Sequence, residues 1–239
     1  MSLKDFNPIS KSFTSYARSN SYELVGKPLD LTFDSGRKTT LSLARVPLEN
    51  GISLQVTLSD GLNDFPAECL KLRENFYLVN FAIQNFGATY ILDFERGLAT
   101  HVVVGGDAPM ADYGYIDGAA ADTSERHALS DDLDGNTVDW TFSPYLTARV
   151  KYGKDSLSVS FPNAGAMPMP PFEINGFAAI RLAEGLYFQY GQVSFGGLKV
   201  GLFLASDFFS VLFDGDLFGV PGLPPLGTVG GYGQIIADK

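Results

Sequence analysis

Two long apolar stretches of the sequence repeat each other and set the expected organisation of the chain. Residues 72–94 read LRENFYLVNFAIQNFGATYILDF, and residues 182–204 read LAEGLYFQYGQVSFGGLKVGLFL. Each begins with Leu-x-Glu, has a Tyr one residue into an apolar run, and has a Gly ten residues after that Tyr. Apolar runs bounded by turn residues are typical of β strands, so each stretch predicts two strands, Phe76–Ile83 and Ala88–Phe94 in the first.

A second pair of segments has almost the same spacing. Val138–Phe142 (VDWTF) aligns with Leu29–Phe33 (LDLTF) at an offset of 109 residues, whereas the long stretches align at an offset of 110. About seven short strand patterns, separated by turns such as Asp-Ser-Gly and Asn-Gly, are found in each half. We interpret the chain as one antiparallel β unit that occurs twice.

The strands of the repeated stretches are apolar on both faces. In Phe76–Ile83 one face carries Tyr77, Val79 and Phe81, and the other carries mostly apolar residues as well. A barrel wall with one solvated face would alternate more regularly between apolar and polar residues. We therefore expect these strands to be covered on both sides, with the other half of the molecule as the simplest cover.

Closing each half into a barrel would remove the exposed strand edges, and seven or eight strands enclose room for side chains or one small ligand. Residues 105–135 are rich in Gly, Ala and Asp, and the last residues are rich in Gly and Pro. These changes in composition divide the chain into five segments: an N-terminal extension (1–22), a first repeat (23–104), a linker (105–135), a second repeat (136–220) and a C-terminal tail (221–239).

Composition and charge narrow the functional classes. The formal net charge is −10, which disfavours nucleic acid and anionic membrane as partners, because both are bound through Lys and Arg. The single Cys69 permits no intramolecular disulfide. The N-terminus has no apolar segment typical of a signal peptide, and no run approaches the roughly 18 apolar residues of a membrane helix. We expect a cytoplasmic protein without a membrane partner.

The motifs of metal and cofactor chemistry are missing from the sequence. His101 and His127 have no Cys partner, so a zinc site is not indicated. Asp132-x-Asp134-Gly135 has part of a calcium-loop pattern, but Ser130 and Thr141 stand where an EF-hand needs Asp or Asn and Glu. There is no Gly-rich phosphate loop either. We therefore expect no metal and no cofactor.

Polar side chains on the repeated strands are the remaining candidates for chemistry. Tyr77 and Tyr187 place a hydroxyl on an apolar strand, where it needs a hydrogen-bond partner if buried. Glu74 and Glu184 precede these strands, and a desolvated carboxylate beside a phenol can act as a general acid or base, with Arg181 as a nearby cation. Residues that could line a pocket, or simply pack in the core, are Tyr90, Trp140, Gln189 and Tyr190.

Four blocks of the sequence resemble a known family. YELVGKPLDLTFDSG and LRENFYLVNFAIQNFGATYILDFERGLATHVV are similar to the first half of the molybdenum cofactor biosynthesis protein F (MoaF) family. FSPYLTARVKYGKDSLSVSF and IRLAEGLYFQYGQVSFGGLKVGLFL are similar to its second half. The resemblance implies an internally duplicated calycin (lipocalin-like) barrel and a link to molybdenum cofactor metabolism, without a defined reaction. The family's Tyr-Glu-His-x-Tyr block reads LTARVKYG here, so no role of that block is implied.

Three functions remain open from the sequence. The first is a binding protein that holds a small apolar or aromatic ligand, with Tyr77, Glu74, Tyr90, Trp140, Gln189 and Tyr190 as candidate ligand-binding residues. The second is an enzyme acting on a small aromatic acid, similar to calycin-fold phenolic acid decarboxylases, with Tyr187, Glu184 and Arg181 as catalytic candidates. The third is a structural or assembly protein with filled cores. The sequence also leaves a homodimer open.

Overall fold

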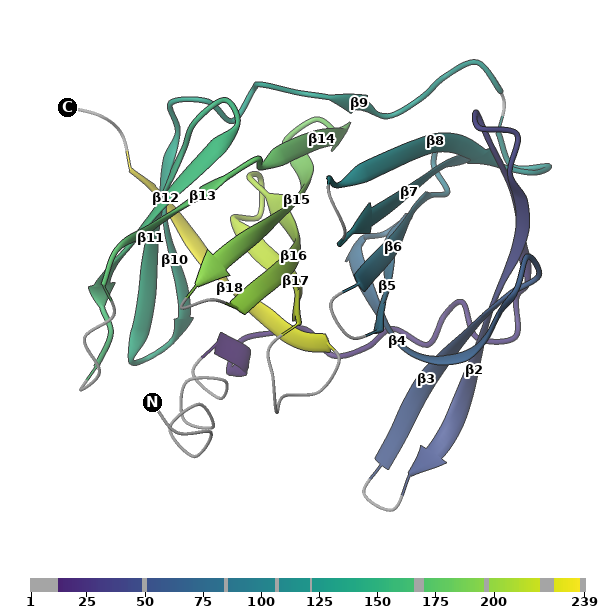
Figure 1. The fold of residues 1–239 in the computed structure, drawn as a ribbon, viewed down its shortest axis with the longest axis horizontal. Helices are drawn as coiled ribbons and strands as arrows, with labels where there is room; N and C mark the ends of the chain where they lie inside the picture. The colour runs from purple at the N-terminus through teal and green to yellow at the C-terminus, as the bar shows by residue number, and fades with distance from the viewer. Residues whose placement is uncertain are drawn as a thin grey trace. The chain divides into compact units, whose positions relative to one another are not determined.

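The chain forms two compact units of antiparallel β strands, which confirms the all-β class. A computed structural model describes residues 13–48, 51–83, 86–105, 108–120, 122–165, 170–195, 198–219 and 226–236. The N-terminal unit is residues 19–127, and the C-terminal unit is residues 128–236 together with the preceding segment 13–18. Figure 1 shows the strands of both units as arrows coloured along the chain.

The N-terminal unit is a closed barrel in which each strand pairs with its neighbours in sequence. Pairing of the first strand with the eighth closes the ring, so the barrel has no free sheet edge along its closing seam. The strands are β1 (Leu29–Phe33), β2 (Lys38–Leu48), β3 (Gly51–Leu58), β4 (Leu62–Arg73), β5 (Phe76–Ile83), β6 (Phe86–Asp93), β7 (Leu98–Val104) and β8 (Met110–Ile116).

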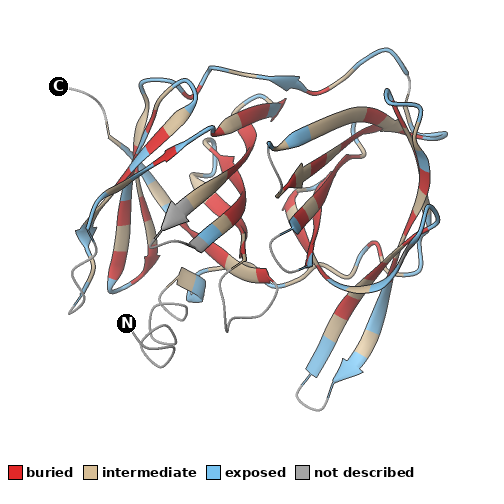
Figure 2. Cartoon of the chain, in the orientation of Figure 1, coloured by how far each residue is buried: buried red, intermediate tan, exposed pale blue. Residues whose placement is uncertain are grey.

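Alternate residues of these strands fill the barrel, as the period of two in a strand requires. The core contains Leu31 and Phe33 of β1, Val79 of β5 and Tyr90 of β6, and Cys69 is a small buried member of it. Figure 2 shows the buried segments of the barrel strands in red.

The C-terminal unit is a ten-stranded antiparallel sheet in the order β13-β12-β11-β10-β18-β17-β16-β15-β14-β9. Near its two ends are β13 and β14, which follow each other in the chain with only Gly176 and Phe177 between them. The strands are β9 (Ala128–Leu129), β10 (Thr137–Ser143), β11 (Leu146–Tyr152), β12 (Ser156–Asn163), β13 (Phe172–Asn175), β14 (Ala178–Ala183), β15 (Leu186–Phe195), β16 (Leu198–Asp207), β17 (Leu212–Phe218) and β18 (Leu226–Ile236).

The two units share their strand order. In the C-terminal unit β10 pairs with both β11 and β18, as β1 pairs with both β2 and β8 in the barrel. The strands β13 and β14 together take the place of the long β4, because β13 pairs with the strand before it and β14 with the strand after it. The strands β15 to β18 then follow as β5 to β8 do in the N-terminal unit.

A glycine lies at the same place on the closing strand of each unit. Gly114 on β8 pairs with Phe33, and a side chain there would overlap the carbonyl oxygen of Thr32. Gly231 on β18 would in the same way overlap the carbonyl oxygen of Thr141. Only a residue without a Cβ allows the backbones of the first and last strands to approach this closely.

The expected boundaries of the linker and the tail differ from the structure. The expected linker (105–135) contains β8, so the barrel has eight strands where about seven were expected. The expected tail (221–239) contains β18, a strand inside the sheet, and residues 237–239 lie outside the described residues. The strand β18 was not recognised because its glycines interrupt the alternation of apolar and polar residues. A side chain at Gly230 would overlap Ala17, and one at Gly233 would overlap the Trp140 ring.

The expected N-terminal extension (1–22) is divided between the units. Residues 1–12 lie outside the described residues, segment 13–18 belongs to the C-terminal unit, and Tyr22 packs against the barrel core. Phe13 lies against Phe142 of the C-terminal core, with the ring centroids 5.1 Å apart. The extension therefore packs against both cores, because its aromatic residues supply apolar area to each.

The strands with two apolar faces are buried on both. Phe76 and Leu78 of β5 alternate with core residues of the barrel and are buried themselves. On β15, Leu186 and Phe188 likewise alternate with core residues and are buried. That the two halves provide this cover for each other stays a prediction.

Candidate functional site

A group of polar side chains gathers inside the barrel at the end where the β1–β2, β3–β4 and β7–β8 turns lie. Arg37, from the β1–β2 turn, approaches Nδ1 of His101 with Nη1 at 2.9 Å and donates from Nη2 to the Tyr90 hydroxyl at 2.6 Å. Its Nε donates to Asp60 of the β3–β4 turn. We call Arg37, Asp60, Tyr90 and His101 the Arg37 cluster.

The register of the sheet brings the two rings of the cluster together. Tyr90 on β6 lies directly opposite His101 on β7, and the rings stack with their centroids 4.6 Å apart. Phe81 of β5 stacks on the other side of Tyr90, and the Phe33 ring lies 6.1 Å from both Tyr90 and His101. The Arg37 guanidinium also lies over the Phe33 and Tyr90 rings, 5.8 and 5.7 Å from their centroids, which is within the range of cation–π contacts. The hydrogen-bonding atoms of the cluster therefore lie beside aromatic rings.

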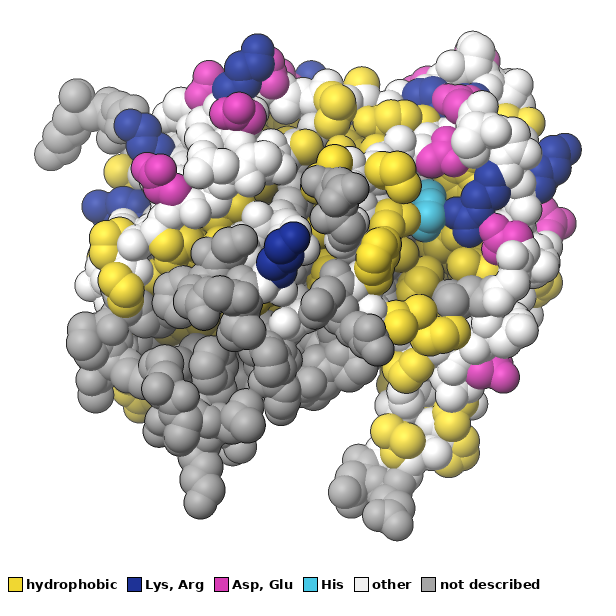
Figure 3. Space-filling view, viewed as in Figure 1, with side chains coloured by type: hydrophobic (Ala, Val, Ile, Leu, Met, Phe, Trp, Pro, Cys, Tyr) yellow, Lys and Arg dark blue, Asp and Glu magenta, His cyan; other side chains and the backbone are white. Residues whose placement is uncertain are grey.

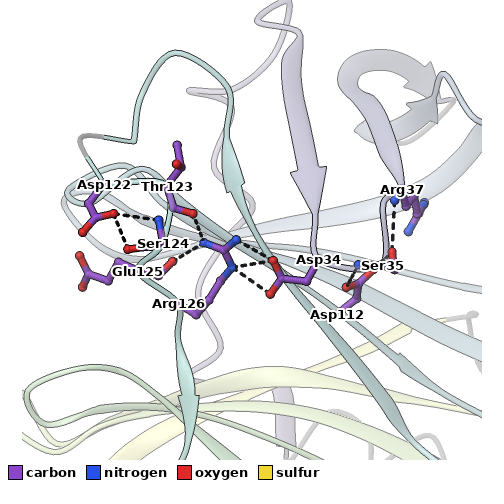
Figure 4. Close-up of polar contacts among 9 residues, drawn as sticks. All are labelled: Asp34, Ser35, Arg37, Asp112, Asp122, Thr123, Ser124, Glu125 and Arg126. Carbon is purple, nitrogen blue, oxygen red and sulfur yellow. Dashed lines mark hydrogen bonds and ion pairs between the residues drawn. The ribbon is translucent and has the colours of Figure 1, made fainter.

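Contacts at the rim hold the turn that carries Arg37 (Figure 4). The Ser35 hydroxyl donates to Asp112 of β8 at 2.6 Å and accepts from the backbone N–H of Arg37 at 3.3 Å. Arg126 donates to both carboxylate oxygens of Asp34 in the same turn. These bonds limit the freedom of a long side chain that would otherwise move in solvent.

The hydrogen bonds fix the protonation of His101. Because a guanidinium has only donors, His101 Nδ1 accepts from Arg37 and its ring hydrogen lies on Nε2. Burial, together with the charge of Arg37, lowers the pKa of His101 to about 4, so the ring is neutral at pH 7. Burial also raises the pKa of Tyr90, which therefore keeps its proton.

Most of the free hydrogen-bonding capacity of the cluster is donor capacity. The Tyr90 hydroxyl accepts from Arg37, so its own hydrogen remains to be donated, and no acceptor for it is found among the described residues. His101 Nε2–H and the remaining N–H groups of Arg37 are also without an acceptor there. Burial alone would raise the pKa of Asp60, but hydrogen bonds from Arg37 and Thr39 lower it. The cluster can thus receive a hydrogen-bond acceptor, such as a carboxylate or carbonyl oxygen.

The cluster reaches the surface of the barrel. Arg37 and Asp60 have side chains 27% and 29% exposed, so a molecule from solvent can contact them. In the space-filling view of Figure 3, a histidine with basic and acidic side chains lies among apolar side chains over the barrel strands.

Two expected site residues of the N-terminal unit, Tyr77 and Glu74, lie near the β4–β5 turn, at the opposite end from the Arg37 cluster, whereas the expected residue Tyr90 belongs to that cluster. Tyr77 is buried and donates its hydroxyl hydrogen to Glu23 at 2.6 Å. Lys71 contacts the same carboxylate at 2.9 Å, and Glu74 is 86% exposed and 3.3 Å from Lys71. The hydrogen bond from Tyr77, with that from Lys71, lowers the pKa of Glu23. Tyr77, Glu23 and Lys71 form a Tyr–carboxylate–cation triad.

The C-terminal unit has a triad of the same kind. Tyr187 donates its hydroxyl hydrogen to Asp132 at 3.2 Å, and Arg181 contacts the same carboxylate oxygen at 3.2 Å. Glu184 is exposed. Burial, together with Asp132, raises the pKa of Tyr187. Arg181 is 50% exposed, so this triad is open to solvent.

The other expected ligand-binding residues of the C-terminal unit separate onto two faces of the sheet. Trp140 is fully buried in the core and donates from Nε1 to the Tyr152 hydroxyl at 3.1 Å. Gln189 is fully buried and donates from Nε2 to the Ser206 hydroxyl at 2.7 Å. Tyr190 follows Gln189 on β15 and therefore points to the opposite face.

Six residues of these sites were not predicted from the sequence, namely Glu23, Lys71 and Asp132 of the triads and Arg37, Asp60 and His101 of the Arg37 cluster. Glu23 and Asp132 lie 109 residues apart, and Lys71 and Arg181 lie 110 apart, so the repeat offset itself contained the signal for both triads. Arg37 and His101 had no such signal. They come from separate turns and strands, and only the closed ring brings them to Tyr90.

An open pocket of about 620 Å³ lies on the solvent-facing side of the C-terminal sheet. It is lined mainly by polar and charged residues of β10 to β13, including Arg149, Lys151 and Glu173, and by none of the expected site residues. Arg149 is paired there with Asp139 at 2.7 Å. Phe172 is the one aromatic residue among its described lining residues, whereas several rings surround the Arg37 cluster.

Comparisons with known proteins leave the site to be interpreted from its own chemistry. No protein-family model matches the sequence, and no curated protein matches it significantly. Within the described ranges, no three His, Cys, Asp or Glu side chains are grouped so that they could hold a metal ion. No helix in the same ranges is long and apolar enough to span a membrane.

Proposed function

We propose that this chain is a lipocalin-like binding protein whose N-terminal barrel holds a small aromatic ligand by its hydrogen-bond acceptor group. The observation that carries the proposal is the set of donors on Arg37, Tyr90 and His101 that converge beside aromatic walls and lack acceptors among the described residues. Ligand sites commonly combine apolar walls, which supply affinity, with a few polar groups that fix orientation.

The acceptor group is best supplied by a carboxylate. A guanidinium binds a carboxylate through charge-assisted hydrogen bonds, which are stronger than those between neutral groups. Asp60 and Asp112 lie close by and offset the charge of Arg37, so a ligand with several negative charges is disfavoured. A small aromatic monocarboxylate fits both the donors and the rings.

Membership of the MoaF-like calycin group is part of the proposal. It is supported by the strand order that the two units share, by the Tyr–carboxylate–cation triad of each unit, and by the closing glycines. These correspondences favour an internal duplication. A link to molybdenum cofactor metabolism and a cytoplasmic location rest on the sequence alone.

The same residues favour a second candidate, an enzyme acting on a small aromatic acid. The Tyr90 hydroxyl keeps its proton and lies 2.6 Å from Arg37, so it can donate to a developing negative charge on a bound acid. Incubation with hydroxycinnamic acids separates the two candidates. Loss of substrate with release of carbon dioxide would favour the enzyme, and binding without turnover favours the binding protein.

Calorimetric titration with 4-methylbenzoate tests the binding proposal. We expect the Arg37→Leu variant to bind this acid at least about tenfold more weakly, because the charge-assisted hydrogen bonds are lost. Arg45→Leu is the matched control, since Arg45 lies on β2, the strand that follows Arg37, but stacks on Tyr22 outside the cluster. Arg37→Lys keeps the charge without the planar fork, and we expect an intermediate loss.

Two results would contradict the proposal. If wild-type protein and Arg37→Leu bind 4-methylbenzoate equally, Arg37 does not receive the carboxylate. If neither 4-methylbenzoate nor a set of other aromatic acids binds at all, the barrel is filled by side chains, as the structural or assembly function requires. Circular dichroism of each variant shows that the loss is not one of folding.

A further inference from the structure

A second group of buried polar side chains crosses the inside of the C-terminal unit. Trp140 of β10 donates to Tyr152 of β11, and Gln189 of β15 donates to Ser206 of β16. The Ser206 hydroxyl lies near enough to the Tyr152 hydroxyl to lower its pKa, so the two pairs adjoin. Because β17 and β18 separate the first two strands from the last two in the sheet, the pairs meet across its curled interior. We call the four residues the Gln189 cluster.

The hydrogen bonds of this cluster are incomplete. Gln189 is fully buried, and its Oε1 has no hydrogen-bond partner. Exchanging the amide oxygen and nitrogen would satisfy the oxygen through Ser206 but would leave the nitrogen without a partner, so either orientation leaves one polar atom unpaired. An unpaired buried polar group is costly, and such groups in folded proteins nearly always have a partner.

The fold does not require polar residues at these positions. Tyr77 and Tyr187 occupy corresponding positions, so Val79 of the barrel corresponds to Gln189. Leu92, which pairs with Tyr77, corresponds to Ser206, which pairs with Tyr187. On the remaining strands Leu31 and Leu43 match Trp140 and Tyr152, by the registers of β1 with β2 and β10 with β11. All four positions are apolar in the N-terminal unit, where the same strand order is formed without them.

We propose that the Gln189 cluster is a second binding site, which takes a small neutral aromatic molecule through a hydroxyl group. The unpaired Gln189 oxygen accepts the hydroxyl hydrogen of the ligand. The ligand oxygen in turn accepts the hydrogen of the Ser206 hydroxyl, whose oxygen already accepts from Gln189 Nε2. A hydroxyl both donates and accepts, and it therefore matches what this cluster lacks.

The surroundings favour a neutral aromatic ligand. The Phe208 ring lies between 5.7 and 6.3 Å from the rings of Trp140, Tyr152 and Tyr187, and Phe213 lies 5.2 Å from Trp140. Burial of a charged group among such rings without a counter-ion is costly. The Arg37 cluster, with its guanidinium, differs in this respect. The second site therefore does not depend on the function proposed for the barrel.

Trp140 makes the test direct, because it is the single tryptophan of the chain and belongs to the cluster. We expect 4-methylphenol to change Trp140 fluorescence, excited at the red edge of the tryptophan absorption. The isosteric 1,4-dimethylbenzene, which lacks the hydroxyl, should bind at least about tenfold more weakly, because it leaves the Gln189 oxygen unpaired. The Gln189→Leu variant should abolish this preference, whereas Arg37→Leu should leave it unchanged.

The proposal is overturned if 4-methylphenol does not change Trp140 fluorescence, or if folded Gln189→Leu retains the preference for the hydroxyl compound. Either result would mean that a trapped water completes the hydrogen bonds of Gln189. Should Gln189→Leu fail to fold, Ser206→Ala gives the same test, since it removes the donor to the ligand oxygen; an unchanged preference there would also overturn the proposal. Loss of 4-methylbenzoate binding in Arg37→Leu alone tests only the barrel site.

Discussion

The two units differ most in where they place polar side chains inside a shared strand order. The barrel carries Tyr90 and His101 near one end, where the corresponding positions of the C-terminal unit are Leu204 and Gly215. The C-terminal unit instead carries Gln189 and its partners, where the barrel is apolar. The Arg37 cluster presents hydrogen-bond donors and a positive charge. The Gln189 cluster is neutral and presents both a hydrogen-bond donor and an acceptor.

Other features are the same in both units. Each has a glycine on its closing strand and a Tyr–carboxylate–cation triad, Tyr77 with Glu23 and Tyr187 with Asp132. The features that shape the strands are therefore shared, and the interior polar groups are not. The comparison indicates that the strand framework tolerates different chemistry inside, because backbone hydrogen bonds hold the sheet whichever side chains fill its interior.

The largest expected effect comes from exchanging the interior residues of the two units. Val79→Gln should lower the free energy of unfolding by about 3 kcal/mol, because it buries a larger polar side chain in the apolar barrel. Gln189→Val should change it by less than about 1 kcal/mol, since an already unpaired group is removed. Urea unfolding followed by circular dichroism measures both. Equal losses would show that Gln189 is fully paired.

Acid should affect the two units in opposite directions. The pKa of His101 is about 4 in the folded barrel against 6.5 when unperturbed, so the unfolded state binds more protons between these values. The unfolding free energy should therefore fall by up to about 3 kcal/mol as the pH falls through this window. His127, whose pKa burial also lowers, adds to the same trend. His101→Gln should reduce the loss.

In the C-terminal unit Asp214 gives the unfolding free energy the opposite dependence on pH. Burial raises its pKa to about 6 from 3.8, despite the ion pair with Arg18 at 2.9 Å, so the folded state binds more protons between these values. Its contribution to stability is fully present at low pH and is lost as the pH rises through about 6. Asp214→Asn should remove this dependence in urea titrations at several pH values. A variant that kept it would assign the dependence to another group.

The closing glycines should be equally sensitive. Gly114→Ala and Gly231→Ala should each cost about 2 kcal/mol, since the new Cβ would force the first and last strands of the unit apart. Unfolding monitored by Trp140 fluorescence reports on the C-terminal core, and circular dichroism reports on both units. Gly118→Ala is a control for glycine replacement in a turn, where no atom lies near the new Cβ but φ is positive. A large effect at only one closing position would show that the units close differently.

The smallest effect is expected from the triads. Tyr77→Phe should lower the melting temperature by about 3 °C, because the bond to Glu23 is short and the hydroxyl is buried. Tyr187→Phe should lower it by only about 1 °C, since its bond to Asp132 is longer and that carboxylate is exposed. Differential scanning calorimetry can resolve the difference. A reversed order would mean that the Asp132 triad is the more rigid one.

The triads show how far a repeat in sequence can be used to predict contacts. Tyr77 and Tyr187 were recognised from their equal positions, and the same offset joins Glu23 to Asp132, although these residues lie outside the apolar runs. The strand β8 was missed because its Met-Ala-Asp-Tyr-Gly-Tyr-Ile pattern is interrupted by polar residues and a glycine. That glycine is required by the close approach of Thr32, which local sequence does not reveal.

The sequence by itself determined the all-β class and the buried positions of β5 and β15, because these depend on local alternation and apolar content. Only the tertiary structure decided which polar groups meet. Arg37 and His101 lie 64 residues apart and come together because the sheet closes on itself. The Gln189–Ser206 and Trp140–Tyr152 pairs adjoin because the sheet curls across its own interior. Closure and curvature are properties of the whole sheet, and no short stretch of sequence specifies them.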